Sequence, residues 1–155
     1  FAPLIGVSAT MKNNISFNAE YRDARTLTLN SDAGQVVEAN SKSFVFGAGY
    51  KFVNFNSFLK IKSSQKGVSN DLTLNLERNM SNNNALIRKI DTRITQATSG
   101  SKTLSINFTA NYVVSKRITL GAYFDHQVNT PLVSSTAYPT TNSSYGLSIN
   151  MSLTK

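Results

Sequence analysis

The sequence predicts an all-β fold, namely an antiparallel transmembrane β-barrel of which these 155 residues form an open segment of about nine strands. Three observations support this prediction. Apolar and polar residues alternate with a period of two, which is the side-chain period of a β-strand. Clusters of turn-forming residues separate the alternating segments. No uninterrupted apolar run approaches the roughly 20 residues that a membrane-spanning helix needs.

The alternation is clearest between Thr103 and Val114, where even positions are apolar and odd positions are small and polar, apart from Val113. Segment 143–153 repeats the pattern, and two earlier segments share it. We expect one face of these strands to contact lipid through Phe17, Tyr21, Phe44, Phe46, Tyr50, Leu104, Ile106, Phe108, Tyr112, Tyr145, Leu147, Ile149, Met151 and Leu153. We expect the other face to line a channel through Ser105, Asn107, Thr109, Asn111, Ser148 and Asn150.

Residues typical of turns, chiefly Asn, Ser, Gly and Lys, divide the chain into segments. The predicted strands are 4–11, 15–30, 36–53, 56–62, 70–78, 85–97, 102–114, 118–125 and 143–153. The segment 56–62 carries the shortest alternation, and a surface loop explains it equally well.

Alternation fits both a soluble β-sandwich and a membrane barrel, because one face is buried in apolar surroundings in each. Strand length favours the barrel, since about 9–11 residues cross a bilayer, whereas strands elsewhere are commonly about five or six residues long. With a periplasmic C-terminus, the periplasmic turns are expected at 12–14, 54–55, 79–84 and 115–117. The outer connections are then 31–35, 63–69, 98–101 and 126–142, so that the longest lies outside, as in known barrels.

Arg88 shares the parity of Leu86 and Ile90 and is therefore predicted to face lipid. An arginine costs roughly 2–4 kcal/mol at the bilayer midplane and little near the interface, so we expect Arg88 near the periplasmic rim.

Nine strands do not close a bacterial barrel, in which an even number is the rule. Either one predicted strand is wrong and the barrel has eight strands, or further strands precede this chain.

Catalytic and metal-binding chemistry finds little support in the sequence. His126 is the single histidine, and with Asp125 it is predicted to form a polar pair at a strand end rather than part of a catalytic triad. The acidic residues are scattered, so no metal site, cofactor or enzymatic activity is expected. Gly47, Gly49, Gly121 and Gly146 have the channel-facing parity, which indicates close backbone packing or barrel curvature.

The formal net charge of +8 comes from dispersed Lys and Arg residues, which indicates a solvated or lumenal distribution and no nucleic-acid partner. Cysteine is absent, so disulfides and thiolate metal sites are excluded. The first six residues lack the pattern of a signal peptide. We therefore expect either that a signal was removed or that the chain begins within a longer protein.

Six stretches of the sequence are specific enough to compare with a known family, namely 20–29, 46–50, 70–72, 87–91, 129–133 and 143–146. Together they resemble the C-terminal region of the SprA/Sov family, the outer-membrane translocon of the type IX secretion system. The resemblance runs along the whole chain. The end at 153–155 departs from barrel assembly signals, which generally finish on an aromatic residue, and this leaves the mode of insertion open.

The resemblance implies a wide pore in the outer membrane that exports folded cargo proteins, including gliding-motility adhesins. It also implies as partners the remaining strands of the same barrel, outer-membrane lipid, a PorV-like barrel, periplasmic accessory proteins and the cargo. Two other hypotheses are a small self-contained barrel acting as an anchor or adhesin, and a porin. A small barrel predicts that its first and last strands pair with each other.

Overall fold

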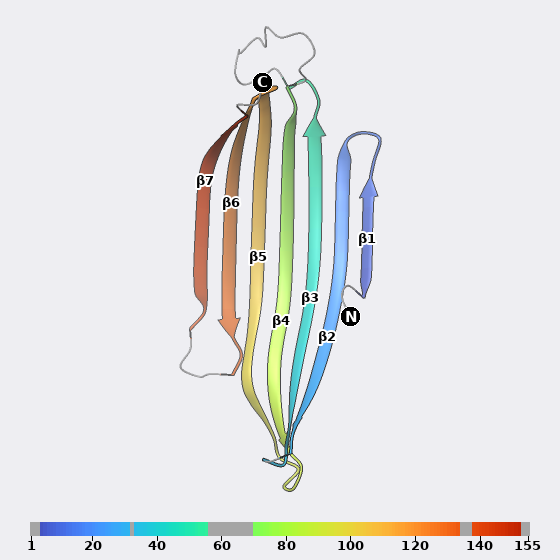
Figure 1. The fold of residues 1–155 in the computed structure, drawn as a ribbon, viewed down its shortest axis with the longest axis vertical. Coiled ribbons are helices and arrows are strands. Elements are labelled where there is room, and N and C mark those ends of the chain that lie inside the picture. Colours follow the sequence, from blue (N-terminus) through green and yellow to red (C-terminus); the bar gives the residue numbers. More distant parts are fainter. Residues whose placement is uncertain (1–3, 32, 56–69, 134–137, 153–155) are drawn as a thin grey trace.

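The computed structural model describes residues 4–31, 33–55, 70–133 and 138–152. Within these ranges the chain forms one antiparallel sheet whose strands follow in sequence order (Figure 1). The strands are β1 (Ile5–Thr10), β2 (Ile15–Asn30), β3 (Gln35–Phe52), β4 (Leu72–Lys89), β5 (Thr95–Ser115), β6 (Ile118–Pro131) and β7 (Thr140–Met151). Across these described residues, no helix is long and apolar enough to cross a membrane. The expected all-β antiparallel fold is confirmed.

Strand β2 has the predicted bounds, and β1, β3 and β7 differ from theirs by one to three residues at each end. The turns between β1 and β2 and between β2 and β3 also lie where Asn and Gly predicted them. Asn14 and Gly34 take positive φ angles of 62° and 55° there, which these residue types tolerate best. The predicted strand 56–62 lies outside the described residues.

The predicted turn at 79–84 is wrong, because these residues lie inside β4. They pair along their whole length with β3 on one side and β5 on the other. The Asn83 side chain accepts a 2.6 Å hydrogen bond from the Ser41 hydroxyl across the strands. Pairing on both sides satisfies the backbone, so it overrides the turn preference of asparagine. The chain turns instead at 90–94, where Lys89 N donates to Ile94 O.

The predicted turn at 98–101 is also wrong and marks a β-bulge inside β5. Ala85 pairs with Ser99 and Leu86 with Ala97, which leaves Thr98 as the extra residue. A glycine within a strand commonly accompanies such a bulge, and Gly100 lies two residues away. Strand β6 likewise continues to Pro131, so the expected loop at 126–142 is reduced to 132–139. The described residues therefore form seven strands where eight were expected.

The connections gather at two ends of the sheet (Figure 1). We call the end with connections 11–14, 53–71 and 116–117 the proximal end, and β7 also finishes there. The distal end carries connections 31–34, 90–94 and 132–139. The predicted outer connection 63–69 lies outside the described residues, whereas the predicted turns at 12–14 and 115–117 do share one end of the sheet.

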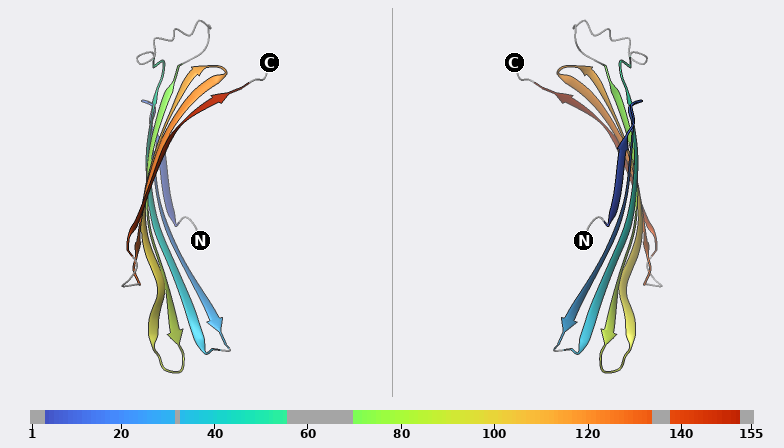
Figure 2. Two further views of the ribbon diagram at one scale, coloured as in Figure 1. Left: turned by 90° about the vertical axis from the view of Figure 1, so that its left-hand side faces the viewer. Right: turned by 90° about the vertical axis from the view of Figure 1, so that its right-hand side faces the viewer.

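The sheet is a single twisted layer, seen edge-on in Figure 2. The described residues include no fully buried side chain, and Val45, 9% exposed, is the one buried hydrophobic residue among them. Strands β1 and β7 form the two edges, each paired with one neighbour in the described part of the chain. These seven strands thus do not close into a barrel, and they lack the two-layer core of a soluble domain.

Candidate membrane-facing and channel-facing surfaces

The pairing register aligns the apolar residues of neighbouring strands on one face. One row across the sheet consists of Ala9, Phe17, Ala48, Leu76, Phe108, Phe124 and Tyr145. We define the apolar band as the alternate residues on this face within 15–21, 44–52, 72–80, 104–112, 120–128 and 145–151. The thirteen described residues that were predicted to face lipid all belong to this band, and Leu153 lies outside the described residues.

Much of the apolar band is exposed. Tyr145 and Leu147 are 82% and 87% exposed at the β7 edge, and Phe44 and Leu76 in the middle of the sheet are each 46% exposed. Soluble monomers rarely expose contiguous apolar patches larger than a few hundred Å². An apolar face of this extent is unusual for the surface of a soluble monomer.

The height of the band fits a bilayer. On β3 it runs from Phe44 to Phe52, eight residue steps that span about 27 Å at roughly 3.4 Å per residue. For strands tilted by roughly 35–45°, this span is about 19–22 Å along the membrane normal, close to the roughly 25 Å of the lipid-facing bands of known barrels. The strands themselves are longer and continue past the band toward the distal end.

Aromatic residues lie at both borders of the band. At the proximal border, the Tyr50 and Phe52 rings are 4.3 Å apart, and Phe55 lies 5.5 Å from Phe52. The Tyr112 hydroxyl donates to Phe55 O at 3.3 Å. At the distal border Tyr21 pairs with Phe44. Girdles of aromatic residues at the two membrane–water interfaces are typical of outer-membrane barrels.

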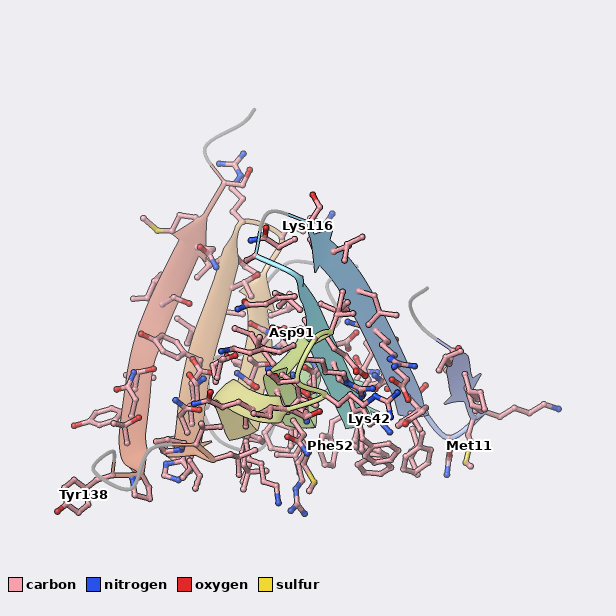
Figure 3. The ribbon with its side chains drawn as sticks, turned by 90° about the horizontal axis from the view of Figure 1, so that it is seen from below. Met11, Lys42, Phe52, Asp91, Lys116 and Tyr138 are labelled. Carbon is pink, nitrogen blue, oxygen red and sulfur yellow. The ribbon has the colours of Figure 1, made fainter. Side chains whose placement is uncertain are left out.

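The opposite face is mainly polar, although it also carries apolar residues such as Val45. Asn107 donates a 2.8 Å hydrogen bond to Asp125, and Asn75 donates a 3.5 Å bond to Thr109. All six residues predicted to line a channel lie on this face. Side chains project from both sides of the single layer, with Met11, Lys42 and Phe52 on the side of the apolar band (Figure 3). The sheet therefore has one mainly apolar face and one mainly polar face.

Glycines on the polar face make room for neighbouring side chains. A Cβ atom at Gly49 would lie 2.5 Å from Ser16 Oγ and 2.7 Å from Asn75 Oδ1. At Gly146 it would lie 2.6 Å from the ring of Tyr123, which covers the glycine from the adjacent strand. Side chains rather than backbones make the closest approach at these two positions, so the structure shows close packing there but not the expected close backbone packing.

The pair formed by Asp125 and His126 does not exist as predicted, because both residues lie inside β6 and point to opposite faces. His126 Nδ1 lies 2.8 Å from Ser143 Oγ, and the imidazole stacks on Phe124 within the apolar band. Asp125 lies on the polar face, so it cannot orient the imidazole as in a catalytic triad. In the described ranges, no group of three or more His, Cys, Asp and Glu residues could hold a metal ion.

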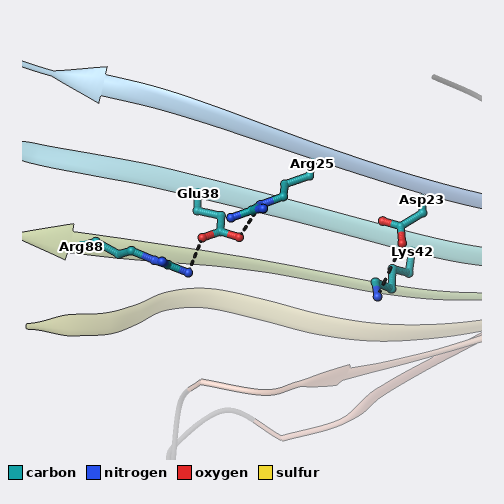
Figure 4. Close-up of polar contacts among 5 residues, drawn as sticks. All are labelled: Asp23, Arg25, Glu38, Lys42 and Arg88. Carbon is teal, nitrogen blue, oxygen red and sulfur yellow. Dashed lines mark hydrogen bonds and ion pairs between the residues drawn. The ribbon is translucent and has the colours of Figure 1, made fainter.

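Charged residues gather on the same side of the sheet as the apolar band, just beyond its distal border (Figure 4). Lys42 Nζ lies 3.5 Å from Asp23 Oδ2. Farther along, Glu38 lies 2.6 Å from both Arg25 and Arg88. The hydrogen bond from Arg25 and the two positive charges hold the pKa of Glu38, which lies outside the band, below its ordinary value although desolvation opposes them.

Arg88 does lie near one end of the sheet and on the apolar side, as its parity predicted. That end is the distal one, however, because β4 continues through 79–84 without a turn. The predicted position at the same end as the C-terminus is therefore wrong.

Sequence reasoning missed Arg78, which lies within the band between Phe46 and Ile106. Its parity with Leu76 and Met80 was the available signal.

The sequence matches no known protein-family model, and a search of curated proteins likewise finds no match.

Proposed function

We propose that this chain is part of the wall of an outer-membrane β-barrel, with the apolar band in lipid and the polar face lining an aqueous channel. The observation that carries this proposal is a one-layer sheet with a continuous, uncovered apolar face. Lipid supplies an apolar partner over the whole face at once. The height of the band and its aromatic borders support the same assignment.

The two unpaired edges favour a segment of a larger barrel over a small self-contained one. In the described part of the chain, β1 pairs only with β2, and β7 pairs only with β6. Exposed strand edges invite further pairing, and bacterial barrels have an even number of strands. The sheet is therefore completed by further strands of the same barrel on both sides.

Together with the resemblance to the SprA/Sov family, this geometry leads us to propose a protein-conducting pore of the type IX secretion system. Its role is mechanical, since the wall holds lipid apart from water while folded cargo passes. The Ser, Thr and Asn side chains of the polar face suit such a passage because they offer hydrogen bonds without bulk, and its glycines add no side-chain bulk. A PorV-like barrel and periplasmic accessory proteins complete the proposed assembly.

Single cysteines test the wall, because the chain has none of its own. In intact membranes, a membrane-impermeant maleimide should label cysteines at Asn107 and Asn111. Cysteines at Phe108 and Tyr112 should react only after detergent is added. Equal labelling of the two pairs would show that both faces meet water and would refute the membrane assignment.

Cargo export tests the secretion role separately. Deleting 143–155 should trap cargo in the periplasm, and normal export after that deletion would contradict the role. A second variant avoids ambiguity from misfolding. Attaching a bulky maleimide to a cysteine at Asn107, after the protein has assembled, should reduce export, whereas the same reagent should leave export unchanged in the Phe108 variant. Undiminished export with Asn107 fully modified would exclude this face from the cargo path.

A further inference from the structure

A row of polar side chains borders the apolar band at its distal side. The pairing register aligns Asp23, Lys42, Asn82, Lys102 and Thr130 across β2 to β6 on the face of the band. The next row toward the proximal end is wholly apolar and consists of Tyr21, Phe44, Met80, Leu104 and Val128. If the band lies in hydrocarbon, this boundary lies at the level of the lipid headgroups.

Two cations near this boundary are without a counter-ion. Arg78 and Lys102 are exposed, and neither forms an ion pair with any residue that the structure describes. The carboxylates on this face belong to Asp23 and Glu38, on β2 and β3, where Lys42, Arg25 and Arg88 engage them. Lys102 is three strands from Asp23, roughly 14 Å at about 4.8 Å per strand.

A groove of about 410 Å³ lies at the same place, between β4, β5 and β6. Its apolar lining comes from Met80, Leu104 and Val128, and its polar lining includes Asn82, Lys102 and Thr130. The polar groups all lie on the distal side of the apolar ones. The groove therefore has one end suited to an acyl chain and one suited to a polar headgroup.

We propose that this groove, which Lys102 lines and beside which Arg78 lies one row toward the proximal end, binds an anionic membrane lipid through its headgroup phosphate. The acyl chain packs against Met80, Leu104 and Val128. The ammonium of Lys102 and the side chains of Asn82 and Thr130 donate to the phosphate oxygens. This inference rests on the proposed position of the band in lipid.

Arg78 gives the strongest reason for an anionic ligand. It lies on β4 four residues from Asn82, roughly 13 Å toward the proximal end, and so within the hydrocarbon layer. A lipid-facing arginine is costly there unless its guanidinium reaches the interface. The apolar stem allows the guanidinium to extend as far as the level of Met80, toward the polar row, so that a phosphate held there lies on the side to which Arg78 points and reduces its missing counter-charge.

Native mass spectrometry of the purified full chain in detergent tests the site. The probes are phosphatidylglycerol and phosphatidylcholine with identical acyl chains, and inorganic phosphate alone. We expect the chain to retain phosphatidylglycerol preferentially. In the double variant R78Q/K102Q, the ratio of retained phosphatidylglycerol to retained phosphatidylcholine should fall by about fivefold for each cation removed.

The matched control is R22Q/K116Q, which removes the same charge from the polar face and from a proximal turn. It should bind as the unaltered chain does. The site would be overturned if R78Q/K102Q retained as much phosphatidylglycerol as the unaltered chain. It would also be overturned if R22Q/K116Q lost as much phosphatidylglycerol as R78Q/K102Q. Inorganic phosphate that displaces phosphatidylglycerol at equal concentration would show a free-anion site and overturn the lipid assignment.

The same experiment separates the two proposals. Retention of both lipids without preference would reject the headgroup site and leave the membrane wall intact. Retention of neither lipid, together with maleimide labelling of the cysteine at Phe108 in intact membranes, would reject both.

Discussion

Two adjacent residues in β5 offer a sharp test of which face meets lipid. Ala110 lies in the apolar band between Leu74 and Ala122, whereas Thr109 lies on the polar face between Asn75 and Tyr123. The substitutions Ala110→Arg and Thr109→Arg introduce the same charged side chain at positions one residue apart. Only the direction of the new side chain differs.

The expected cost follows from the depth of Ala110. Phe108 lies in the middle row of the band, and Ala110 is two residues away, about 5 Å along the membrane normal for a strand tilted by roughly 45°. Arginine costs roughly 2–4 kcal/mol at the midplane and about 0–1 kcal/mol near the interface. We therefore expect Ala110→Arg to cost about 2 kcal/mol, a change of about 30-fold in the ratio of folded to unfolded protein.

Urea unfolding in lipid vesicles, followed by tyrosine fluorescence, measures this difference. Thr109→Arg should shift the free energy of unfolding by less than about 0.5 kcal/mol, as is usual for a solvated substitution. The faces would be reversed if Thr109→Arg were the more damaging change. Equal effects of the two variants would refute the separation into a lipid face and a water face.

Three further predictions address the distal end, the glycines and the edges. Glu38→Gln should increase amide exchange in the distal parts of β2 to β4, because its two arginine partners then repel each other. Because folding lowers the pKa of Glu38, the carboxylate contributes its full stabilisation above about pH 4.3 and loses it as the pH falls through the folded pKa. Amide exchange at the distal end should therefore rise in acid, and a flat pH profile would contradict this. Gly146→Val should loosen β7, since its Cβ meets the Tyr123 ring, and unchanged exchange in β7 would argue against that packing. Paired cysteines at Val7 and Leu147 should form no disulfide within one molecule, whereas efficient bridging would favour a small closed barrel.

The alternating pattern was sufficient to predict which residues share a face, because side-chain direction depends only on the local period of the strand. Strand β2 was predicted with correct bounds for this reason. Where the pattern contained several asparagines, at 79–84, the prediction of a turn was wrong. The extended conformation of 79–84 depends on partners in the strands on both sides. These partners lie roughly 40 residues earlier and roughly 20 residues later in the sequence, so a prediction from neighbouring residues alone does not take them into account.

Arg78 shows how one wrong boundary affects a candidate site. The predicted strand ended at residue 78, so this arginine was read as a terminal residue. In the structure it is flanked by Phe46 and Ile106 well inside the apolar band. The row that joins Lys42, Asn82 and Lys102 was equally unpredictable, because it depends on the register of three strands.

The amino-acid sequence by itself determined the all-β class, the two faces and the turns at Asn14 and Gly34, since each depends on residues close together in the chain. Only the tertiary structure decided the number of strands, the end of the sheet to which Arg88 belongs, and the open single layer. These features depend on which strand lies beside which and in what register. The physical reason is that hydrogen bonds between strands join residues far apart in sequence, and no local preference specifies them.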